Sequence, residues 1–426
     1  MSYSGYIAKL QDLRPHPNAD RLQLGTVFGN QVIVSLEYKE GDVGLYLPTD
    51  GKLGVEYAEK NNLVRKKDAE GNEIGGYLEP DKRHIRSIKL RGEFSDGLFM
   101  PLESLSTFTD ISKLQVGDII KELNGVLICE KYVPFRKPQG ENQQVPYKKK
   151  RSEFVQFLEH ENTKQLAYNL KEFQKGDLCY ITNKMHGTSG RTTYTLQEIE
   201  VPLKWYEKLL RREPKIKHEY ATATGTRRVV LTLDDTIDKG YYKDNAFREK
   251  YHDLLAPKLH KGETIYYEIV GFVAPGSPIM PTCDNKKVND KEFLRRFGNK
   301  TTFTYGCQDG ENDIYAYRMT MTNVDGVVVE YPHELVKIRC EQMGVKVVPQ
   351  IYKFIYSTQQ DLMEKVAKCE YAPDIVDPTH VNEGIVVRIE RGDSFKAYKS
   401  KNIYFKILEG IIKEDALQPD MEEEEI

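Results

Sequence analysis

The stretch NKMHGTSGR, residues 183–191, carries side chains suited to chemistry on phosphate groups. It follows GDLCYIT, which is expected to form a strand, and it brings together Lys184, His186, Gly187 and Arg191. A turn between two strands needs a glycine but has no need of flanking cations. A lysine at a strand end, beside glycines that permit close approach of the backbone, can contact or attack a phosphate. Taken alone, however, a KxxG pattern with a histidine is also typical of a solvated turn.

Four later fragments place charged residues where they are unusual. Arg227 lies in GTRRVVL, at the start of an expected strand. Glu268 in TIYYEIVGFV and Glu383 in NEGIVVRIE accompany apolar strands, where a carboxylate is costly unless it is paired or binds a metal. Lys399 and Lys401 in FKAYKSKNIYF alternate along a strand, so both face one side. Taken singly, structural salt bridges explain the carboxylates equally well, and a solvated edge strand explains the lysines.

The order of these fragments resembles motifs I, Ia, III, IV and V of the covalent nucleotidyltransferases, the superfamily of polynucleotide ligases and mRNA capping enzymes. K-x-H-G-T, T-R-R, E-I-V-G, E-G-I-V-V-R and K-S-K-N follow one another along the chain. The resemblance covers about residues 155–408. It implies an α+β domain of antiparallel sheets that binds a nucleotide between the sheets.

The resemblance also implies a role for each matching residue. Lys184 would be the nucleophile that takes AMP as a phosphoramidate, and Glu383 would help to bind a divalent metal. IYAYRM, residues 314–319, resembles the strand whose aromatic ring stacks on adenine, so Tyr317 is the candidate, although a packed core tyrosine is an equal explanation. The other matches would bind ATP or AMP: His186, Gly187, Arg191, Arg227, Glu268, Lys399 and Lys401.

Two positions depart from the usual motifs. Most of the superfamily has aspartate where this chain has His186, and the histidine resembles one branch of the RNA ligases. In the last motif, Lys396 offers a competing register. KSKN is the better match and favours Lys399 and Lys401.

An attack by Lys184 on phosphorus requires a neutral amine, whereas a free lysine is almost fully protonated at pH 7. Cations around it (Arg191, Lys399, Lys401 and a metal) would favour the neutral amine. The same cations would stabilise charge on the phosphate oxygens. The expected cofactors are therefore ATP, with AMP held covalently on Lys184, and Mg²⁺ or Mn²⁺, which prefer hard oxygen ligands.

Composition limits the other possibilities. The 62 Lys+Arg against 65 Asp+Glu give no overall positive charge, so any nucleic-acid site must be a local patch. No apolar run approaches the roughly 18 residues of a membrane span, and the N-terminus lacks the apolar stretch of a signal peptide. Six scattered cysteines without a CxxC pair indicate reduced thiols in a cytoplasmic protein.

At 426 residues, the chain is expected to contain more than one domain. Residues 1–130, with short apolar runs broken by Gly, Asp, Asn and Pro, are predicted to form an all-β OB-like barrel that binds nucleic acid. Residues 131–154 are predicted to be a linker and residues 413–426 an acidic tail. Residues 155–412 would be the nucleotidyltransferase domain. Within it, helices are expected over 201–220 and 334–345.

The basic residues of the first domain lie in one phrase, RHIRSIKLRGEFSDGLFMPL. The phrase is similar to the barrel that precedes the catalytic domain in one group of RNA ligases. Arg83, Arg86, Lys89 and Arg91 would supply the positive groove with which OB-folds bind strands. A solvated strand face explains these four residues equally well.

The position of the barrel discriminates among the ligases. DNA ligases and capping enzymes are similar to each other in carrying an OB domain after motif V, but only about 25 residues follow that motif here. The early barrel and His186 resemble the RNA ligases that seal 3′-OH/5′-phosphate nicks and require ribose on the 3′-OH side. We therefore expect an ATP-dependent RNA ligase whose partner is RNA or an RNA-containing nicked duplex, with no membrane and no evident obligate protein partner. The alternatives are a DNA ligase, a capping guanylyltransferase, or a nucleic-acid-binding protein with a decayed catalytic domain.

Overall fold

The computed structural model describes residues 3–67, 73–76, 78–132, 153–204, 215–227, 229–231, 246–288, 290–370, 372–392 and 394–415. The chain divides into two compact units. One comprises Met1–Lys137, Asp284–Asn299 and Lys401–Leu417, and the other comprises Pro138–Cys283, Lys300–Ser400 and Gln418–Ile426. The predicted linker and acidic tail lie largely outside the described residues, and the domain boundaries drawn from the sequence stay predictions.

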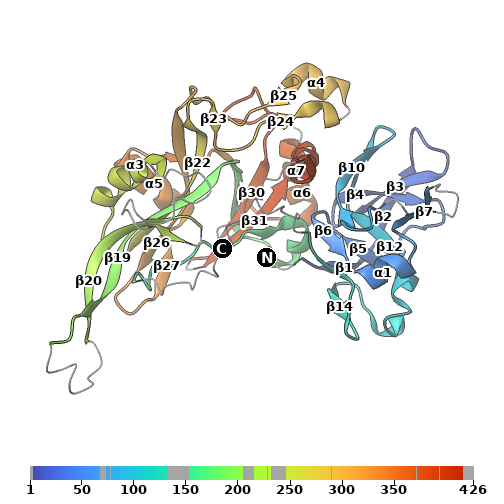
Figure 1. The fold of residues 1–426 in the computed structure, drawn as a ribbon, viewed down its shortest axis with the longest axis horizontal. Helices are drawn as coiled ribbons and strands as arrows, with labels where there is room; N and C mark the ends of the chain where they lie inside the picture. Colours follow the sequence, from blue (N-terminus) through green and yellow to red (C-terminus); the bar gives the residue numbers. More distant parts are fainter. Residues whose placement is uncertain are drawn as a thin grey trace. The chain divides into compact units, whose positions relative to one another are not determined.

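The first unit is built on short strands, as its interrupted apolar runs predict. Those that form its main sheets are β1 (Gly5–Lys9), β2 (Gln11–Pro15), β3 (Leu22–Val27), β4 (Asn30–Ser35), β5 (Val43–Leu47), β6 (Gly51–Leu53), β9 (His84–Ile85), β12 (Leu98–Pro101), β13 (Ile119–Ile120) and β16 (Cys129–Lys131). The sheet orders are β12-β5-β1-β13, β2-β3-β4 and β16-β6-β9 (Figure 1). Ile7, Leu45 and Leu47 are fully buried in a shared core, because alternate side chains of β1 and β5 point inward.

Two later segments complete the first unit. They carry α4 (Lys291–Phe297) and α7 (Ile403–Asp415). The Lys89 ammonium lies 2.5 Å from Asp290, whose carboxylate caps α4, and Lys406 on α7 forms an ion pair with Asp96. Tyr404 stacks on Phe293 with ring centroids 4.7 Å apart. The β-rich first unit therefore depends on contacts with residues far along the chain.

The second unit contains a five-stranded sheet of order β17-β31-β30-β18-β29. Its strands are β17 (Lys164–Gln165), β18 (Leu178–Asn183), β29 (Gln350–Ile355), β30 (Gly384–Glu390) and β31 (Phe395–Lys401). Helix α6 (Gln359–Glu370) buries Leu362 and Val366 in the same apolar cluster as Ile181, Val387 and Ile389 of the sheet. One face of this sheet is thus packed against a helix, which leaves the other face for the site.

A larger sheet of eight strands forms the rest of the second unit. Its main path is β21-β20-β19-β22-β26-β27, with β23 pairing β22 and β28 pairing β26 (Figure 1). The strands are β19 (Thr188–Val201), β20 (Lys215–Gly225), β21 (Val230–Leu231), β22 (Glu263–Ala274), β23 (Ser277–Pro278), β26 (Asn312–Thr322), β27 (Val328–Glu330) and β28 (Lys346–Val347). Helices α3 (Ala246–Leu255) and α5 (His333–Met343) accompany them. The order of an all-β module followed by an antiparallel α+β domain confirms the predicted fold class.

The two helix predictions had different outcomes. The helix expected over 334–345 is α5, which ends at Met343 before a left-handed Gly344. The helix expected over 201–220 is wrong at its described residues: Val201 ends β19, residues 202–204 are not helical, and residues 215–220 belong to β20 and pair with β19. Residues 205–214 lie outside the described part of the chain. Among the described residues, no helix combines the length and the apolar character that a membrane crossing requires.

Candidate functional site

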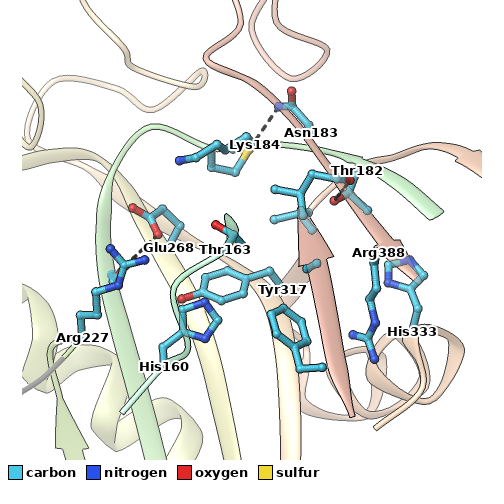
Figure 2. Close-up of a pocket in the computed structure, with 16 residues that line it drawn as sticks. His160, Thr163, Thr182, Asn183, Lys184, Arg227, Glu268, Tyr317, His333 and Arg388 are labelled. Carbon is cyan, nitrogen blue, oxygen red and sulfur yellow. Dashed lines mark hydrogen bonds between the residues drawn. The ribbon is translucent and has the colours of Figure 1, made fainter. Parts of the chain in front are cut away.

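A pocket in the second unit lies between its two sheets and gathers four of the predicted site residues (Figure 2). Lys184 comes directly after β18 of the five-stranded sheet. Glu268 comes from β22 and Tyr317 from β26 of the larger sheet, with Ser189 of β19 beside them. Arg227 lines the same pocket just beyond β20. Residues spread over more than a hundred positions thus meet at one cavity.

Lys184 is held by its backbone and by its side chain. Its N–H donates to the carbonyl of Gly384 at 3.0 Å, which fixes the chain as it leaves β18. Its Nζ lies 2.7 Å from Glu383 Oε1, and the Glu383 side chain is only 1 % exposed. A carboxylate so deeply buried is stable only when it is paired or bound to a cation. The two residues that the sequence assigned to nucleophile and metal therefore form one ion pair.

His186 is not among the residues that line the pocket, and its predicted contact with the nucleotide stays a prediction. Its imidazole is buried, lies edge-on to Phe303 with centroids 4.7 Å apart, and places Nδ1 3.9 Å from Glu383 Oε2. Its backbone N–H donates to the Tyr305 hydroxyl at 2.6 Å. The ring of His186 is therefore directed into the protein, where it lies beside the buried carboxylate of Glu383.

Gly187 also lies outside the pocket lining, and its role is close packing of the two strands. A Cβ at this position would come within 2.2 Å of the Ile269 carbonyl oxygen, and one at Gly190 within 2.3 Å of the Tyr267 ring. Any side chain at either position would push β19 away from β22. The glycines therefore set the spacing of the strands that carry Ser189 and Glu268.

Tyr317 reaches the pocket because of an irregularity in its strand. Tyr266 pairs with Arg318 and Tyr267 with Ala316, so Tyr317 is the extra residue of a β-bulge. Bulges re-aim a side chain out of the regular alternation, and they are common beside active sites. Burial, and next the charge of Glu268, raise the pKa of the Tyr317 hydroxyl above its ordinary value.

Arg191 lies outside the pocket lining, and its predicted contact with ATP or AMP stays a prediction. Its guanidinium is almost fully buried and donates to the carbonyls of Phe157, Leu158 and Thr226 instead of lining the pocket. It also stacks over the Phe157 ring, with Cζ 4.1 Å from the centroid. Carbonyl oxygens satisfy a buried guanidinium without a phosphate, so Arg191 positions the segment before β17 and the end of β20.

The alternation of β31 separates the competing lysines. Phe395 and Ala397 line the pocket, and Lys399 stands on the same face of the strand two residues further on. Lys396 is on the opposite face, where its ammonium lies 3.7 Å from Glu172. Because Lys399 is on the pocket face of β31 and Lys396 is not, the structure favours Lys399 as the lysine that corresponds to the last motif. Lys401, in the segment assigned to the first unit, has its ammonium 2.7 Å from Glu409 of α7.

The four basic residues of the first unit are not equivalent. Arg83 donates to the Leu53 and Pro80 carbonyls, and Lys89 is paired with Asp290, so both have structural partners. Arg86 and Arg91 are exposed at the ends of β10 (Ser87–Leu90). Arg91 has a left-handed φ of 48°, at the turn that leads into β11 (Glu93–Asp96). Arg91 also donates to the Asn18 carbonyl at 3.5 Å, and the nucleic-acid contact of the four residues stays a prediction.

Two carboxylates are candidates to hold a divalent ion: Glu268, which lines the pocket, and Glu383, which pairs with Lys184. No group of three or more His, Cys, Asp or Glu side chains in the described ranges has the geometry of a metal site. Mg²⁺ and Mn²⁺ at polyphosphate sites commonly use one or two carboxylates, with phosphate and water oxygens as the other ligands. The buried Glu383 therefore fits such an ion as a hard ligand.

Several residues that line the pocket were not predicted from the sequence. They are His160, Thr163, Thr182, Asn183, His333, Val348 and Arg388, together with the apolar wall of Val386, Phe395 and Ala397. Arg388 was in reach, because it alternates with Val386 along the fragment NEGIVVRIE and so faces the same side. His333 begins α5 in an unremarkable helical stretch, and nothing in the sequence points to it.

Comparisons with known proteins agree with this architecture. A family model described as an OB-fold domain matches residues 5–102. A search of curated proteins finds no match to the chain. Among solved structures, the RNA ligase of Naegleria gruberi with pyrophosphate superposes with a TM-score of 0.57 at 16 % identity, covering 96 % of this chain and 98 % of that one.

Two further structures of the same Naegleria gruberi protein give similar values. A lysine-to-alanine mutant with ATP and Mn has a TM-score of 0.56 at 18 % identity, covering 96 % of this chain and 99 % of that one. A lysine-to-methionine mutant with AMP and Mn has a TM-score of 0.56 at 16 % identity, covering 97 % and 98 %. The chain therefore begins with an OB-fold domain and has, over nearly its full length, the fold of an RNA ligase.

Proposed function

We propose that this protein is an ATP-dependent RNA ligase that joins 3′-OH and 5′-phosphate ends through a lysyl-AMP intermediate. The observation that carries the proposal is the ion pair of the buried Glu383 with Lys184, which lines a pocket between two sheets. A shared fold alone does not establish an activity. A lysine at a strand end, beside a pocket that also presents Glu268, Arg227 and Tyr317, is the arrangement that nucleotidyl transfer requires.

In the first step, Lys184 Nζ attacks the α-phosphorus of ATP. A nitrogen–phosphorus bond forms, the bond to the bridging oxygen breaks, and pyrophosphate leaves with the electron pair. The attacking amine must lose a proton, and Glu383 Oε1, 2.7 Å away, is placed to receive it. Lys399, on the pocket face of β31, would neutralise charge on the α-phosphate oxygens.

The remaining pocket residues would hold the nucleoside. Tyr317 offers an aromatic ring for stacking on the base, and Glu268 with Arg227 offers polar contacts to the ribose and phosphate. Glu268 is oriented by the Ser189 hydroxyl, which donates to Oε2 at 3.3 Å. A divalent ion held by Glu383 and the phosphates would, when bound, neutralise part of the triphosphate charge.

The later steps transfer AMP to nucleic acid. A 5′-phosphate oxygen attacks the phosphorus of lysyl-AMP and releases Lys184 as an amine, which gives a 5′–5′ adenylylated end. The 3′-OH then attacks that end, the phosphodiester forms, and AMP leaves. Incubation with α-labelled ATP or GTP tests the first step directly. Label from ATP supports the ligase, label from GTP a capping enzyme, and no label a binding protein without catalysis.

Lys399→Ala should depress formation of the protein–AMP adduct by two orders of magnitude or more, because it removes a cation expected at the α-phosphate. Lys396→Ala should leave the rate near that of the wild type, since its ammonium faces Glu172. Single-turnover adenylylation rates measure both. A silent Lys399→Ala beside a defective Lys396→Ala would show that the register is reversed.

Arg86→Gln combined with Arg91→Asn should weaken binding of a nicked duplex and leave self-adenylylation unchanged, because the pocket lies in the other unit. Asparagine suits the left-handed backbone at position 91. Two lost phosphate contacts should reduce the slope of the logarithm of the binding constant against the logarithm of the salt concentration by about 1.8. Lys113→Ala, at an exposed cation of the same unit, is the matched control. An unchanged salt slope in the double variant would remove these arginines from the nucleic-acid surface.

A further inference from the structure

The pocket has a polar end formed by Arg388 and His333, away from Lys184 (Figure 2). Val386 pairs with Thr182 across β18 and β30, and Arg388 pairs with Tyr180 two residues further from the lysine. Both pocket side chains at this end are buried, Arg388 with 5 % and His333 with 2 % of its surface exposed. Buried polar groups are normally satisfied, so a pair at the end of a cavity calls for a ligand.

Arg388 has one nitrogen left for a ligand. Its Nε lies 2.7 Å from Glu390 Oε1, and Nη2 donates to the Tyr331 carbonyl at 2.5 Å. Among the described residues, Nη1 has no hydrogen-bond partner although it is buried. A guanidinium can only donate, so Nη1 requires an acceptor atom on whatever occupies the pocket.

His333 offers a hydrogen-bond acceptor, whereas Arg388 offers a donor. Its backbone N–H donates to Glu390 Oε1 at 3.2 Å, so the same carboxylate fixes both residues. Burial, and next the neighbouring Arg388 charge, lower the pKa of the imidazole to about 4, so the ring is neutral at pH 7. Its side chain hydrogen-bonds with Gln350, and no described residue pairs with Nε2. The Gln350 contact therefore engages Nδ1, and with the proton there Nε2 is a free acceptor.

The pocket lining also has an apolar stretch, at which Val386 pairs with Thr182 between Arg388 and Lys184. Val348, Val386, Phe395 and Ala397 line this stretch with the Tyr317 ring. Flat aromatic ligands are held well by such walls, with a few polar groups fixing their orientation. A nucleobase lying in this stretch would have its phosphate toward Lys184 and its hydrogen-bonding edge toward Arg388 and His333.

We infer that Arg388 and His333 select the nucleobase, with Arg388 Nη1 donating to N1 of adenine and His333 Nε2 accepting from its 6-amino group. This inference rests on the proposed nucleotidyl transfer. Guanine reverses both positions, because its N1 carries a hydrogen that would face the guanidinium and its O6 is an acceptor that would face the Nε2 lone pair. The pair therefore rejects guanine as well as attracting adenine.

Purine analogues test each contact separately in the full-length protein. Purine riboside triphosphate lacks the 6-amino group, and 1-deaza-ATP lacks the N1 acceptor. Each should form the lysyl adduct at least about tenfold less efficiently than ATP, since each leaves one buried group unpaired. His333→Phe should erase the preference for ATP over purine riboside triphosphate and keep the preference over 1-deaza-ATP. Arg388→Met should erase the preference for ATP over 1-deaza-ATP and keep the preference over purine riboside triphosphate.

The outcomes separate this inference from the function on which it rests. Absence of any adduct between wild-type protein and ATP would overturn the ligase itself and the inference with it. If the wild type forms the adduct with ATP and uses both analogues equally well, the base is read elsewhere and only the inference falls; this arm needs no variant to fold. Arg391→Met, which removes a guanidinium paired with Asp177 outside the pocket lining, is the control and should keep both preferences.

Discussion

Replacing Lys184 with alanine is expected to abolish the covalent protein–AMP adduct. The ammonium of Lys184 is the only lysine nitrogen among the described residues that line the pocket, and it is paired with Glu383 at 2.7 Å. Without an amine there, no group can form the nitrogen–phosphorus bond, so the loss should be complete rather than partial. Gel detection of protein labelled from α-labelled ATP measures it directly.

The alanine variant also leaves Glu383 without its ammonium partner, which can destabilise the fold. Lys184→Arg is therefore the sharper variant, because it keeps a cation beside the carboxylate and cannot serve as the nucleophile. It should melt close to the wild-type temperature and form no adduct. Lys346→Ala, at an exposed lysine paired with Asp313, should label normally. Labelling of Lys184→Arg at the wild-type yield would mean that another residue carries the AMP.

The second large effect concerns the sugar at the 3′-OH side of a nick. Sealing should be efficient when that strand ends in ribonucleotides and poor when it ends in deoxyribonucleotides. The 2′-OH is a donor and acceptor that DNA lacks, and a site that hydrogen-bonds it leaves its own groups unpaired with deoxyribose. Such mismatches can cost about 10⁴-fold in specificity. The sugar on the 5′-phosphate side should matter little.

Four nicked duplexes, with RNA or DNA on each side of the break, make this comparison under one set of conditions. Single-turnover sealing from pre-adenylylated protein removes differences in the first step. The duplexes with ribose at the 3′-OH should seal at similar rates, and the two with deoxyribose should lag far behind. Equal rates on the all-DNA nick would favour a DNA ligase instead.

The sequence predicted several residues that line the pocket, but it did not predict the contacts of Arg191 and His186, which lie outside that lining. Glu268 and Tyr317 come from two strands and Lys184 follows a third, yet the order of their motifs was sufficient to place them together. Arg191 could not be placed in this way, because its partners at 157, 158 and 226 are brought to it only by the tertiary fold. His186 reads as a ligand residue from spacing alone, whereas its direction depends on the turn that buries it against Phe303.

Local propensity also failed where pairing decided the structure. Residues 215–220 are charged and lack strict alternation, so they suggested a helix. In the structure they form one ladder with β19, from Lys215 opposite Val201 to Tyr220 opposite Leu196. A long partner strand supplies hydrogen bonds that outweigh a weak preference of the isolated segment. His333 was missed for a similar reason, since only the folded pocket shows that its Nε2 lacks a partner, whereas Arg388 could have been inferred from its alternation with Val386.

The three-segment composition of the first unit has a consequence for its biosynthesis. Asp96 lies in the N-terminal segment, and its partner Lys406 is 310 residues further along the chain. At about 5–20 residues per second, a ribosome needs roughly 15–60 s to make that intervening stretch. The earliest-made strands must therefore wait, with the surface that α4 and α7 later cover still open to solvent, until the residues of α7 have been translated. A nascent chain stalled before residue 400 should consequently be more sensitive to protease in its first 130 residues than the released protein.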